Sequence, residues 1–288
     1  MLKKFSFILY KIIYFVDFLF KTITKKSFLI WIREFIQQDS YKSITILNKK
    51  VSFFVPNPTT LQRVETFFTK EPETLEWIDA FNEKDKIVFW DVGSNIGLYS
   101  IYAALKYSNI EVVSFEPSTN NLRILSRNIS INKLEEKIKI HQLPLTKDKN
   151  QYLMFEESEF IEGWSMNSFG EGIDFEGKSM HPNNRYKIFG TNIDYLIDNN
   201  ILSIPNYVKI DVDGIEDLIL EGANKYLRNP VIRSISIELN ENFKKQCENV
   251  FKIMDQNNFV FKHKKHSKIF DNSKKFSNSF NYVYEKKN

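Results

Sequence analysis

The chain has 288 residues, 42 % hydrophobic and 26 % charged, which fits one large globular domain with additions and excludes an intrinsically disordered chain. Its single cysteine, Cys247, excludes a disulfide framework and a cysteine-based zinc site, and it fits a cytoplasmic protein. Residues 1–50 carry ten Lys or Arg and three acids, and residues 262–288 carry eight lysines and two acids, so the centre is acidic although the net charge is +4. This distribution disfavours a nucleic-acid partner and fits an anionic membrane surface or carrier group near the termini.

The first predicted element is a helix near the N-terminus. Residues 5–20 are almost all apolar, but Lys11 and Asp17 interrupt them, so we expect neither a transmembrane span nor a cleaved signal peptide. On a helical wheel, every charged residue within residues 3–26 falls in a half circle opposite an apolar arc. The sequence therefore predicts an amphipathic helix.

This helix belongs to a predicted N-terminal helical extension, residues 1–50, ahead of a Rossmann-like domain at residues 51–288. A basic amphipathic helix can lie in a membrane interface, which predicts a peripheral membrane contact through residues 3–26 on the inner face of the membrane. The alternative is that the helix packs on the domain or on a second subunit of a homodimer.

The rest of the chain alternates strands with helices. A β-rich segment is expected near residues 43–55 and a helix near residues 60–81. Core strands are expected near residues 87–91, 111–115, 138–141, 206–211 and 231–238, and core helices near residues 97–106, 119–132 and 214–227. Two late strands, near 259–263 and 280–285, predict an antiparallel hairpin at the sheet edge. The pattern predicts an α/β fold with a Rossmann-like, seven-stranded, mainly parallel sheet.

A glycine turn follows the first core strand. Asp91 closes the apolar run, and Gly93 and Gly97 bracket a turn into a helix, whose first N–H groups are free. Asn95 stands where a dinucleotide fingerprint has its second glycine, so the turn is a poor pyrophosphate cradle and indicates an S-adenosylmethionine site. An ordinary strand–helix turn is the alternative. The candidate cofactor-binding residues here are Asp91, Gly93, Ser94, Asn95 and Gly97.

The next two strands end on further candidates for a nucleoside pocket. Glu116 closes the second strand and is followed by Pro117, and an acid at this position can accept both hydrogen bonds of a ribose diol. His141 closes the third strand, near the expected adenine position, although a structural histidine is the alternative there. We include all three among the predicted cofactor-binding residues.

Acids gather at two later strand ends. Asp211, Asp213 and Glu216 follow one apolar strand, and Glu238 ends the next. Transfer of a methyl group to a hydroxyl needs a positioned base, and the base should lie at the carboxyl ends of the strands. We predict Asp211 and Glu238 as catalytic residues, and Asp213 and Glu216 as substrate-binding residues.

The acids have other interpretations. They could bind Mg²⁺ or Ca²⁺, but a twelve-residue calcium loop starting at Asp211 would end on Gly222 where a glutamate is required, so a divalent metal is left open and no metal ligand is predicted. Glu216 could instead stabilise a helix N-terminus. Lys209 should leave its strand on the same face as Asp211, where the two could pair.

Residues 158–190 are rich in Gly, Asn and Ser. A loop of this length in a compact domain is usually functional or disordered. We interpret it as a substrate lid, with Trp164 and Tyr186 as sugar-stacking candidates, and Trp164 is the predicted substrate residue.

Taken together, these segments resemble the FkbM family of S-adenosylmethionine-dependent methyltransferases over about residues 51–262. The segments that carry the resemblance are residues 62–78 (with Arg63, Lys70–Thr74 and Trp77), Asp91–Gly97, Phe115–Pro117, Ser165–Gly170, Thr191–Ile197, Lys209–Glu216, Leu220–Ala223 and Ile237–Glu238. Asp213 departs from the glutamate of many relatives. The resemblance implies a bacterial O-methyltransferase with S-adenosylmethionine as cofactor and a carbohydrate or glycoconjugate acceptor, as in surface-polysaccharide biosynthesis.

Two other classes stay open at this point. One is an NAD(P)-dependent oxidoreductase, which Asn95 in the turn and the lack of a Tyr-x-x-x-Lys pair disfavour. The other is a non-catalytic, membrane-associated scaffold that binds a nucleoside.

Overall fold

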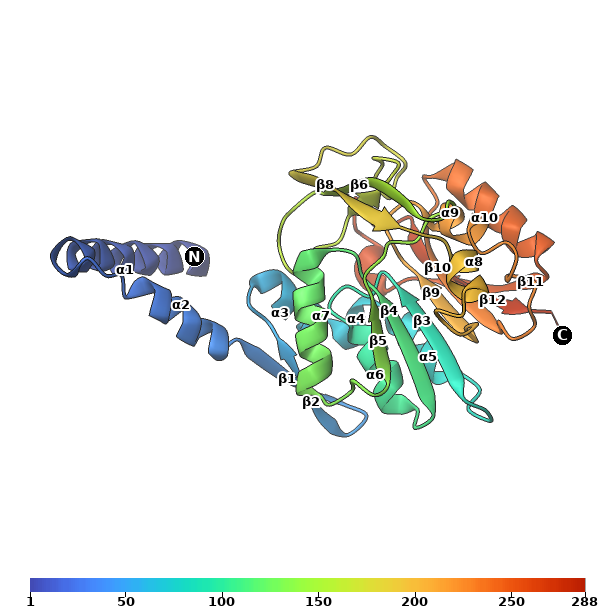
Figure 1. Ribbon diagram of the computed structural model, residues 1–288, viewed down its shortest axis with the longest axis horizontal. Coiled ribbons are helices and arrows are strands. Elements are labelled where there is room, and N and C mark those ends of the chain that lie inside the picture. The colour runs from blue at the N-terminus through green and yellow to red at the C-terminus, as the bar shows by residue number, and fades with distance from the viewer. Residues whose placement is uncertain (288) are drawn as a thin grey trace. The chain divides into compact units, whose positions relative to one another are not determined.

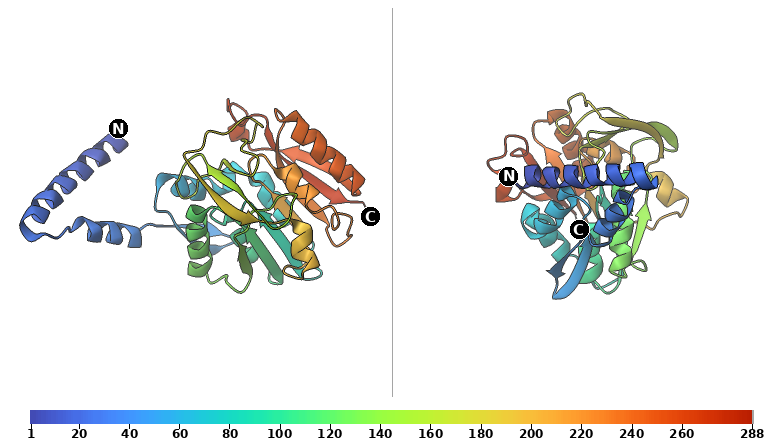
Figure 2. Two further views of the ribbon diagram at one scale, coloured as in Figure 1. Left: turned by 45° about the horizontal axis from the view of Figure 1, so that its top comes forward. Right: turned by 90° about the vertical axis from the view of Figure 1, so that its left-hand side faces the viewer.

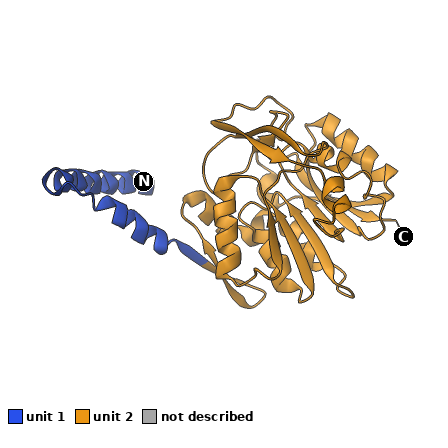
Figure 3. Cartoon of the chain, viewed as in Figure 1, with its two compact units in different colours: residues 1–42 blue, residues 43–288 orange. Residues whose placement is uncertain are grey.

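Strand β1 (Tyr41–Ile46) contains the boundary between the two units of the chain. The computed structural model describes residues 1–287, and the units are residues 1–42 and residues 43–288 (Figure 3). Strand β1 pairs only with β2 (Lys49–Phe54) in a two-stranded sheet.

The N-terminal unit is a pair of helices, α1 (Leu2–Thr24) and α2 (Leu29–Gln38), which meet at an angle in Figure 2. Lys25 adopts a left-handed conformation with φ 61° and ends α1. Among residues 1–287, no helix combines the length and the apolar character that crossing a membrane demands.

A seven-stranded sheet forms the centre of the second unit (Figure 1). Its strands are β3 (Ile87–Val92), β4 (Ile110–Phe115), β5 (Ile138–His141), β9 (Tyr207–Ile210), β10 (Ser234–Asn240), β11 (Phe259–Lys265) and β12 (Ser279–Lys286). The spatial order is β11-β12-β10-β9-β3-β4-β5, and β12 runs antiparallel to both of its neighbours. The predicted α/β class, the seven strands and the antiparallel edge hairpin are confirmed.

Alternating side chains of β3 enter two separate hydrophobic cores. Val88, Trp90 and Val92 pack on one face of the sheet, whereas Ile87 and Phe89 pack on the other. A strand buried on both faces reads as a continuous apolar run, which is why its position was predictable. One core adds residues of α8 (Ile193–Asp198), α9 (Glu216–Glu221) and α10 (Lys244–Gln256), and the other adds residues of α5 (Pro72–Asp79), α6 (Leu98–Lys106) and α7 (Thr119–Ile131).

Several predicted helix boundaries were wrong. The single helix expected near residues 60–81 is three helices, α3 (Pro58–Glu65), α4 (Phe67–Lys70) and α5, because Pro72 cannot continue a helix and starts the third. The helix expected over 214–227 is only α9. Helices α8 and α10 were not predicted.

The interpretation of residues 158–190 as one long loop was also wrong. Strands β6 (Gln151–Glu157), β7 (Asn167–Phe169) and β8 (Asn184–Gly190) form an antiparallel three-stranded sheet with β6 in the centre. Their alternation is weak in the sequence because polar residues occupy many positions. Tyr186, predicted to stack on a sugar, instead packs on Phe155 with ring centroids 5.6 Å apart.

Candidate functional site

The main cavity lies at the carboxyl ends of β3, β4, β9 and β10, where chain order in the sheet reverses between β3 and β9. Ligands bind at such a switch point in open α/β sheets. The cavity has a volume of about 390 Å³. The predicted site residues on its wall are Gly93, Asn95, Glu116, Pro117, Trp164, Asp211, Asp213 and Glu238. Ser94 lines a smaller neighbouring pocket together with Gly93 and Asp211.

The turn after β3 brings backbone close to the end of β9. Gly93 has φ +87°, and a Cβ built on it would lie 1.8 Å from the Asp211 carbonyl oxygen, so only glycine fits. Asn95 also has a positive φ, 50°, and its Nδ2 donates to the Trp164 carbonyl oxygen at 2.9 Å. Gly97 lies at the start of α6 and packs against Leu125 of α7. This residue, which was predicted to bind the cofactor, therefore shapes the turn and does not line the cavity.

Asp91 lies within the sheet. It is fully buried, and Ser100 Oγ donates to its Oδ2 at 2.6 Å. Burial raises the pKa of this carboxyl, while the Lys209 ammonium opposes the shift. Asp91 does not line the cavity, so its direct contact with the cofactor stays a prediction.

Glu116 has the geometry expected of a diol acceptor. Its Oε2 accepts from the Asn95 backbone N–H at 2.8 Å, and its Oε1 accepts from the Ser118 backbone N–H at 2.8 Å. Burial raises the pKa of Glu116 to about 8, against the effect of these two hydrogen bonds. Each oxygen keeps a lone pair for a further donor from the cavity.

His141 lies in the edge strand β5 and packs against the neighbouring strand. Its ring packs on Phe115 with centroids 4.9 Å apart, and burial lowers its pKa, so the neutral ring acts as part of the sheet edge. His141 is not among the residues that line the cavity, and its assignment as a cofactor-binding residue stays a prediction.

Strand register places Asp211 beside Glu238. Ile210 pairs with Ile237 in parallel β9 and β10, so the residues that follow are adjacent at the cavity. Burial and the Asp211 charge raise the pKa of Glu238 well above its ordinary value. Burial alone would also raise the pKa of Asp211, but Lys209 and a hydrogen bond from Glu238 lower it to about 2. The opposite shifts favour an ionised Asp211 beside a protonated Glu238.

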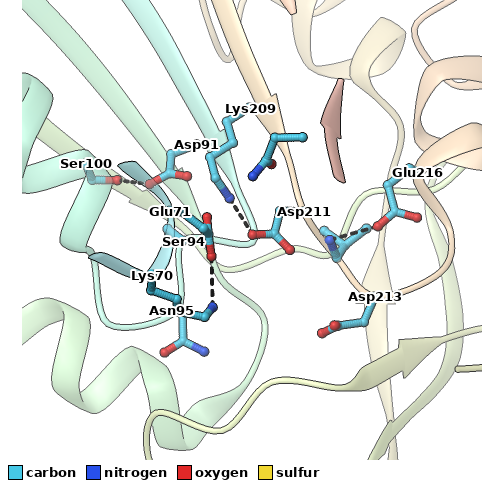
Figure 4. Close-up of polar contacts among 12 residues, drawn as sticks. Lys70, Glu71, Asp91, Ser94, Asn95, Ser100, Lys209, Asp211, Asp213 and Glu216 are labelled. Atoms are coloured by element: carbon cyan, nitrogen blue, oxygen red, sulfur yellow. Dashed lines mark hydrogen bonds and ion pairs between the residues drawn. The ribbon is translucent and has the colours of Figure 1, made fainter. Parts of the chain in front are cut away.

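Lys209 explains why the negative charge stays on Asp211. Its Nζ lies 2.6 Å from Asp211 Oδ2, its side chain is only 2 % exposed, and Tyr99 covers it with the ring centroid 5.2 Å away. Burial would lower the pKa of Lys209, but Asp211, Glu71 and Asp91 outweigh it and raise the pKa. Figure 4 shows Lys209 reaching Asp211, with Glu71 and Lys70 nearby.

Asp213 and Glu216 differ in role. Asp213 lines the cavity, its Oδ2 accepts from the Met166 N–H at 2.6 Å, and burial and the charge of Asp211 raise its pKa to about 6. Glu216 is buried and accepts from the Val212 and Gly214 N–H groups and from Gln246 Nε2. Glu216 therefore fixes the turn before α9 and does not line the cavity, and its role as a substrate residue stays a prediction.

Most residues of the outer wall of the cavity were not predicted from the sequence. Trp164 lines it, and its Nε1 donates to Ser158 Oγ at 2.7 Å. Arg63 from α3, and Phe270 and Phe276 from the segment between β11 and β12, complete it. Arg63 appeared in the sequence only as part of the family resemblance, and the two aromatics lie in a lysine-rich segment without a recognisable motif. Within residues 1–287, no group of three or more His, Cys, Asp or Glu side chains is arranged to hold a metal ion.

Comparison with known proteins points in one direction. Residues 91–261, more than half of the chain, match the family profile described as the methyltransferase FkbM domain. A curated relative, methyltransferase sdnD of Sordaria araneosa, is 38 % identical over 56 residues, which are 19 % of this chain. The match spans only 22 % of that relative's length.

Solved structures similar to this chain share little sequence with it. A precorrin-6y C5,15-methyltransferase from Geobacter metallireducens is 12 % identical, with TM-score 0.44, over 75 % of this chain and 87 % of that one. A putative rRNA methylase from Clostridium thermocellum is 10 % identical, with TM-score 0.45, over 75 % and 95 %. The M. capricolum TrmK complex with S-adenosylhomocysteine is 12 % identical, with TM-score 0.41, over 74 % and 67 %.

Proposed function

The chain belongs to the FkbM family of S-adenosylmethionine-dependent methyltransferases, and we propose that it methylates a sugar hydroxyl of a glycoconjugate. The observation that carries the proposal is the position of two carboxyl side chains, Asp211 and Glu238, next to each other on the cavity wall. Family membership replaces the oxidoreductase alternative, because that reaction would need a different cofactor.

The cavity residues fit the cofactor. Gly93 lets the turn approach the end of β9, where a Cβ would overlap the Asp211 carbonyl oxygen, and Glu116 presents two oxygens for a ribose diol. Asn95 Oδ1 is buried and, among residues 1–287, lacks a hydrogen-bond partner, so it is ready to accept from a ligand. When bound, the cofactor supplies an electrophilic methyl group on a sulfonium centre.

The Asp211–Glu238 pair suits an oxygen nucleophile. Ionised Asp211 accepts a hydrogen bond from the acceptor hydroxyl and orients it. The carboxylate pair would accept the hydroxyl proton as the methyl group leaves the sulfonium sulfur for the oxygen, and Lys209 would keep Asp211 ionised until that point.

A sugar suits the remaining wall. Asp213 provides a further carboxyl oxygen for a ring hydroxyl, and Trp164 provides an aromatic surface on the other side of the cavity. Arg63 and Phe270 enlarge this outer wall, which favours an acceptor larger than a single hydroxyl-bearing fragment.

Label transfer tests the proposal. The purified protein is incubated with S-adenosylmethionine labelled at the methyl group and with sugar nucleotides, lipid-linked glycans and polysaccharide as separate acceptors. We expect label in one carbohydrate fraction that survives mild alkali, as a methyl ether does, and a methylated monosaccharide after acid hydrolysis. Label that alkali releases, or label found only in RNA or protein, contradicts the proposal. Turnover itself would remove the scaffold alternative.

The raised pKa of Glu116 predicts that cofactor binding depends on pH. Below pH 8 the free carboxyl is protonated, whereas a ribose diol donates to the ionised form, so binding lowers the pKa and releases a proton. Affinity for S-adenosylhomocysteine should therefore rise from pH 6 to pH 8, by up to about tenfold per pH unit.

Isothermal titration in two buffers of different ionisation enthalpy measures the released proton. Glu116→Gln should bind S-adenosylhomocysteine more weakly than the wild type does. Its affinity should no longer rise between pH 6 and pH 8. An unchanged pH slope in Glu116→Gln would assign the proton to another group.

A further inference from the structure

Helix α1 exposes nearly all of its surface. Every residue of the helix except Asp17 is solvent-exposed. Phe5, Leu9, Ile12 and Val16 lie on one side and are 45–58 % exposed. An apolar surface of this extent on a soluble protein marks an interaction site.

The charge of α1 is one-sided as well. Residues 3–26 contain six lysines, all exposed, and one acid, Asp17. Asp17 is buried, and it accepts from Ser27 Oγ at 2.7 Å and from the Phe28 and Leu29 N–H groups at 2.7 Å and 3.0 Å. The acid therefore fixes the start of α2 and leaves only positive charge on the outer surface of α1.

The distribution of aromatic residues distinguishes between partners. On the same side as the lysines, Phe7, Tyr14 and Phe18 are 50–57 % exposed, and Lys11 Nζ lies 5.3 Å from the Phe7 ring centroid. A partner helix covers one stripe, so it would leave these aromatics in water. The interfacial region of a bilayer surrounds a helix on several sides, accommodates aromatic rings at headgroup level and lets lysine heads reach the phosphates.

We propose that helix α1 docks the protein on an anionic lipid bilayer, lying in the interface with the side of Leu9 and Val16 toward the acyl chains. The exposed lysines would meet the negative headgroups. The surface of α2 contributes in the same way, since Trp31 and Phe35 are both 58 % exposed. This inference goes beyond the proposed reaction and does not depend on it.

Vesicle sedimentation tests it with the full chain. We expect the protein to pellet with vesicles of phosphatidylcholine and phosphatidylglycerol, less with phosphatidylcholine alone, and less again at high salt. The Leu9→Glu, Val16→Glu double variant should remain in the supernatant. Lys3→Gln and Lys4→Gln should each lower the partition coefficient roughly fivefold at low salt.

Tyr152→Glu is the matched control, because Tyr152 is a 68 % exposed aromatic residue of β6 in the second unit. It should pellet like the wild type. All variants should keep their thermal shift with S-adenosylhomocysteine, so loss of lipid binding is separable from a failure of the methyltransferase unit. The proposal is wrong if the wild type binds neither kind of vesicle. It is also wrong if light scattering shows a dimeric wild type and a monomeric double variant, and neither protein binds lipid.

Discussion

Asp211→Asn is expected to lower kcat roughly 10²–10⁴-fold, the range for loss of a positioned proton acceptor. Asparagine keeps an oxygen that can accept from Lys209 Nζ, which now lies 2.6 Å away, but it removes the charge that orients the acceptor hydroxyl. Because Glu71 and Asp91 also act on Lys209, we expect the fold to survive, with a melting temperature a few degrees lower. The measurement is the initial rate of label transfer at saturating S-adenosylmethionine.

Glu238→Gln provides the discriminating comparison. Glu238 is protonated at neutral pH and donates to Asp211, and a glutamine amide can donate in the same place. Its effect on kcat should therefore be less than about tenfold, far smaller than that of Asp211→Asn. If Glu238→Gln is the inactive variant and Asp211→Asn is active, the roles of the two carboxyls are reversed.

Asp198→Asn is the matched surface control. Asp198 also pairs with a lysine, Lys225, but the pair lies on the exposed surface near α8. Surface pairs contribute little to stability, so this variant should match the wild type in both melting temperature and kcat. A loss of activity here would mean that the Asp211→Asn result reflects general destabilisation.

The sheet was predictable because burial leaves a strong signal. Ile87 to Val92 and Tyr207 to Ile210 are buried throughout, so both strands read as apolar runs. The end of such a run then locates the cavity edge, which is how Glu116, Asp211 and Glu238 could be named from the sequence.

The roles of the individual acids at the cavity edge were harder to predict. Asp91, Asp211 and Glu216 all look like free acids in the sequence, yet Ser100 donates to one oxygen of Asp91 inside the sheet, and backbone amides donate to Glu216. Which acid reaches the cavity depends on the direction of the chain after each strand, and a motif does not contain that information.

Elements that depend on contacts between residues far apart in the sequence were not predicted. The three-stranded sheet β6–β8 depends on pairing between Gln151 and Gly190, far apart along the chain, and its strands carry many polar residues. Phe276 reaches the cavity from a segment whose sequence is dominated by lysine and serine. Neither feature produces a local hydrophobic periodicity that can be recognised in a single sequence.

Gly93→Ala is expected to abolish cofactor binding while the second unit still folds. The left-handed conformation alone, φ +87°, costs an alanine about 1–2 kcal/mol. In addition, the new Cβ would lie 1.8 Å from the Asp211 carbonyl oxygen, which is backbone and can move only with the end of β9. Relieving that overlap displaces the turn that carries Asn95 and, through its N–H, the hydrogen bond to Glu116.

Thermal unfolding with S-adenosylhomocysteine measures the effect. At a ligand concentration of about 100 times Kd, the wild type should gain about 2.7 kcal/mol, whereas Gly93→Ala should show no shift. Gly172→Ala is the matched control, since Gly172 has φ +63° but its Cβ would meet only the flexible Glu156 carboxylate, at 3.1 Å. This control should lose similar stability from its backbone conformation and keep the full ligand shift. Equal shifts in the two variants would show that the close approach of Gly93 to β9 has no part in holding the cofactor.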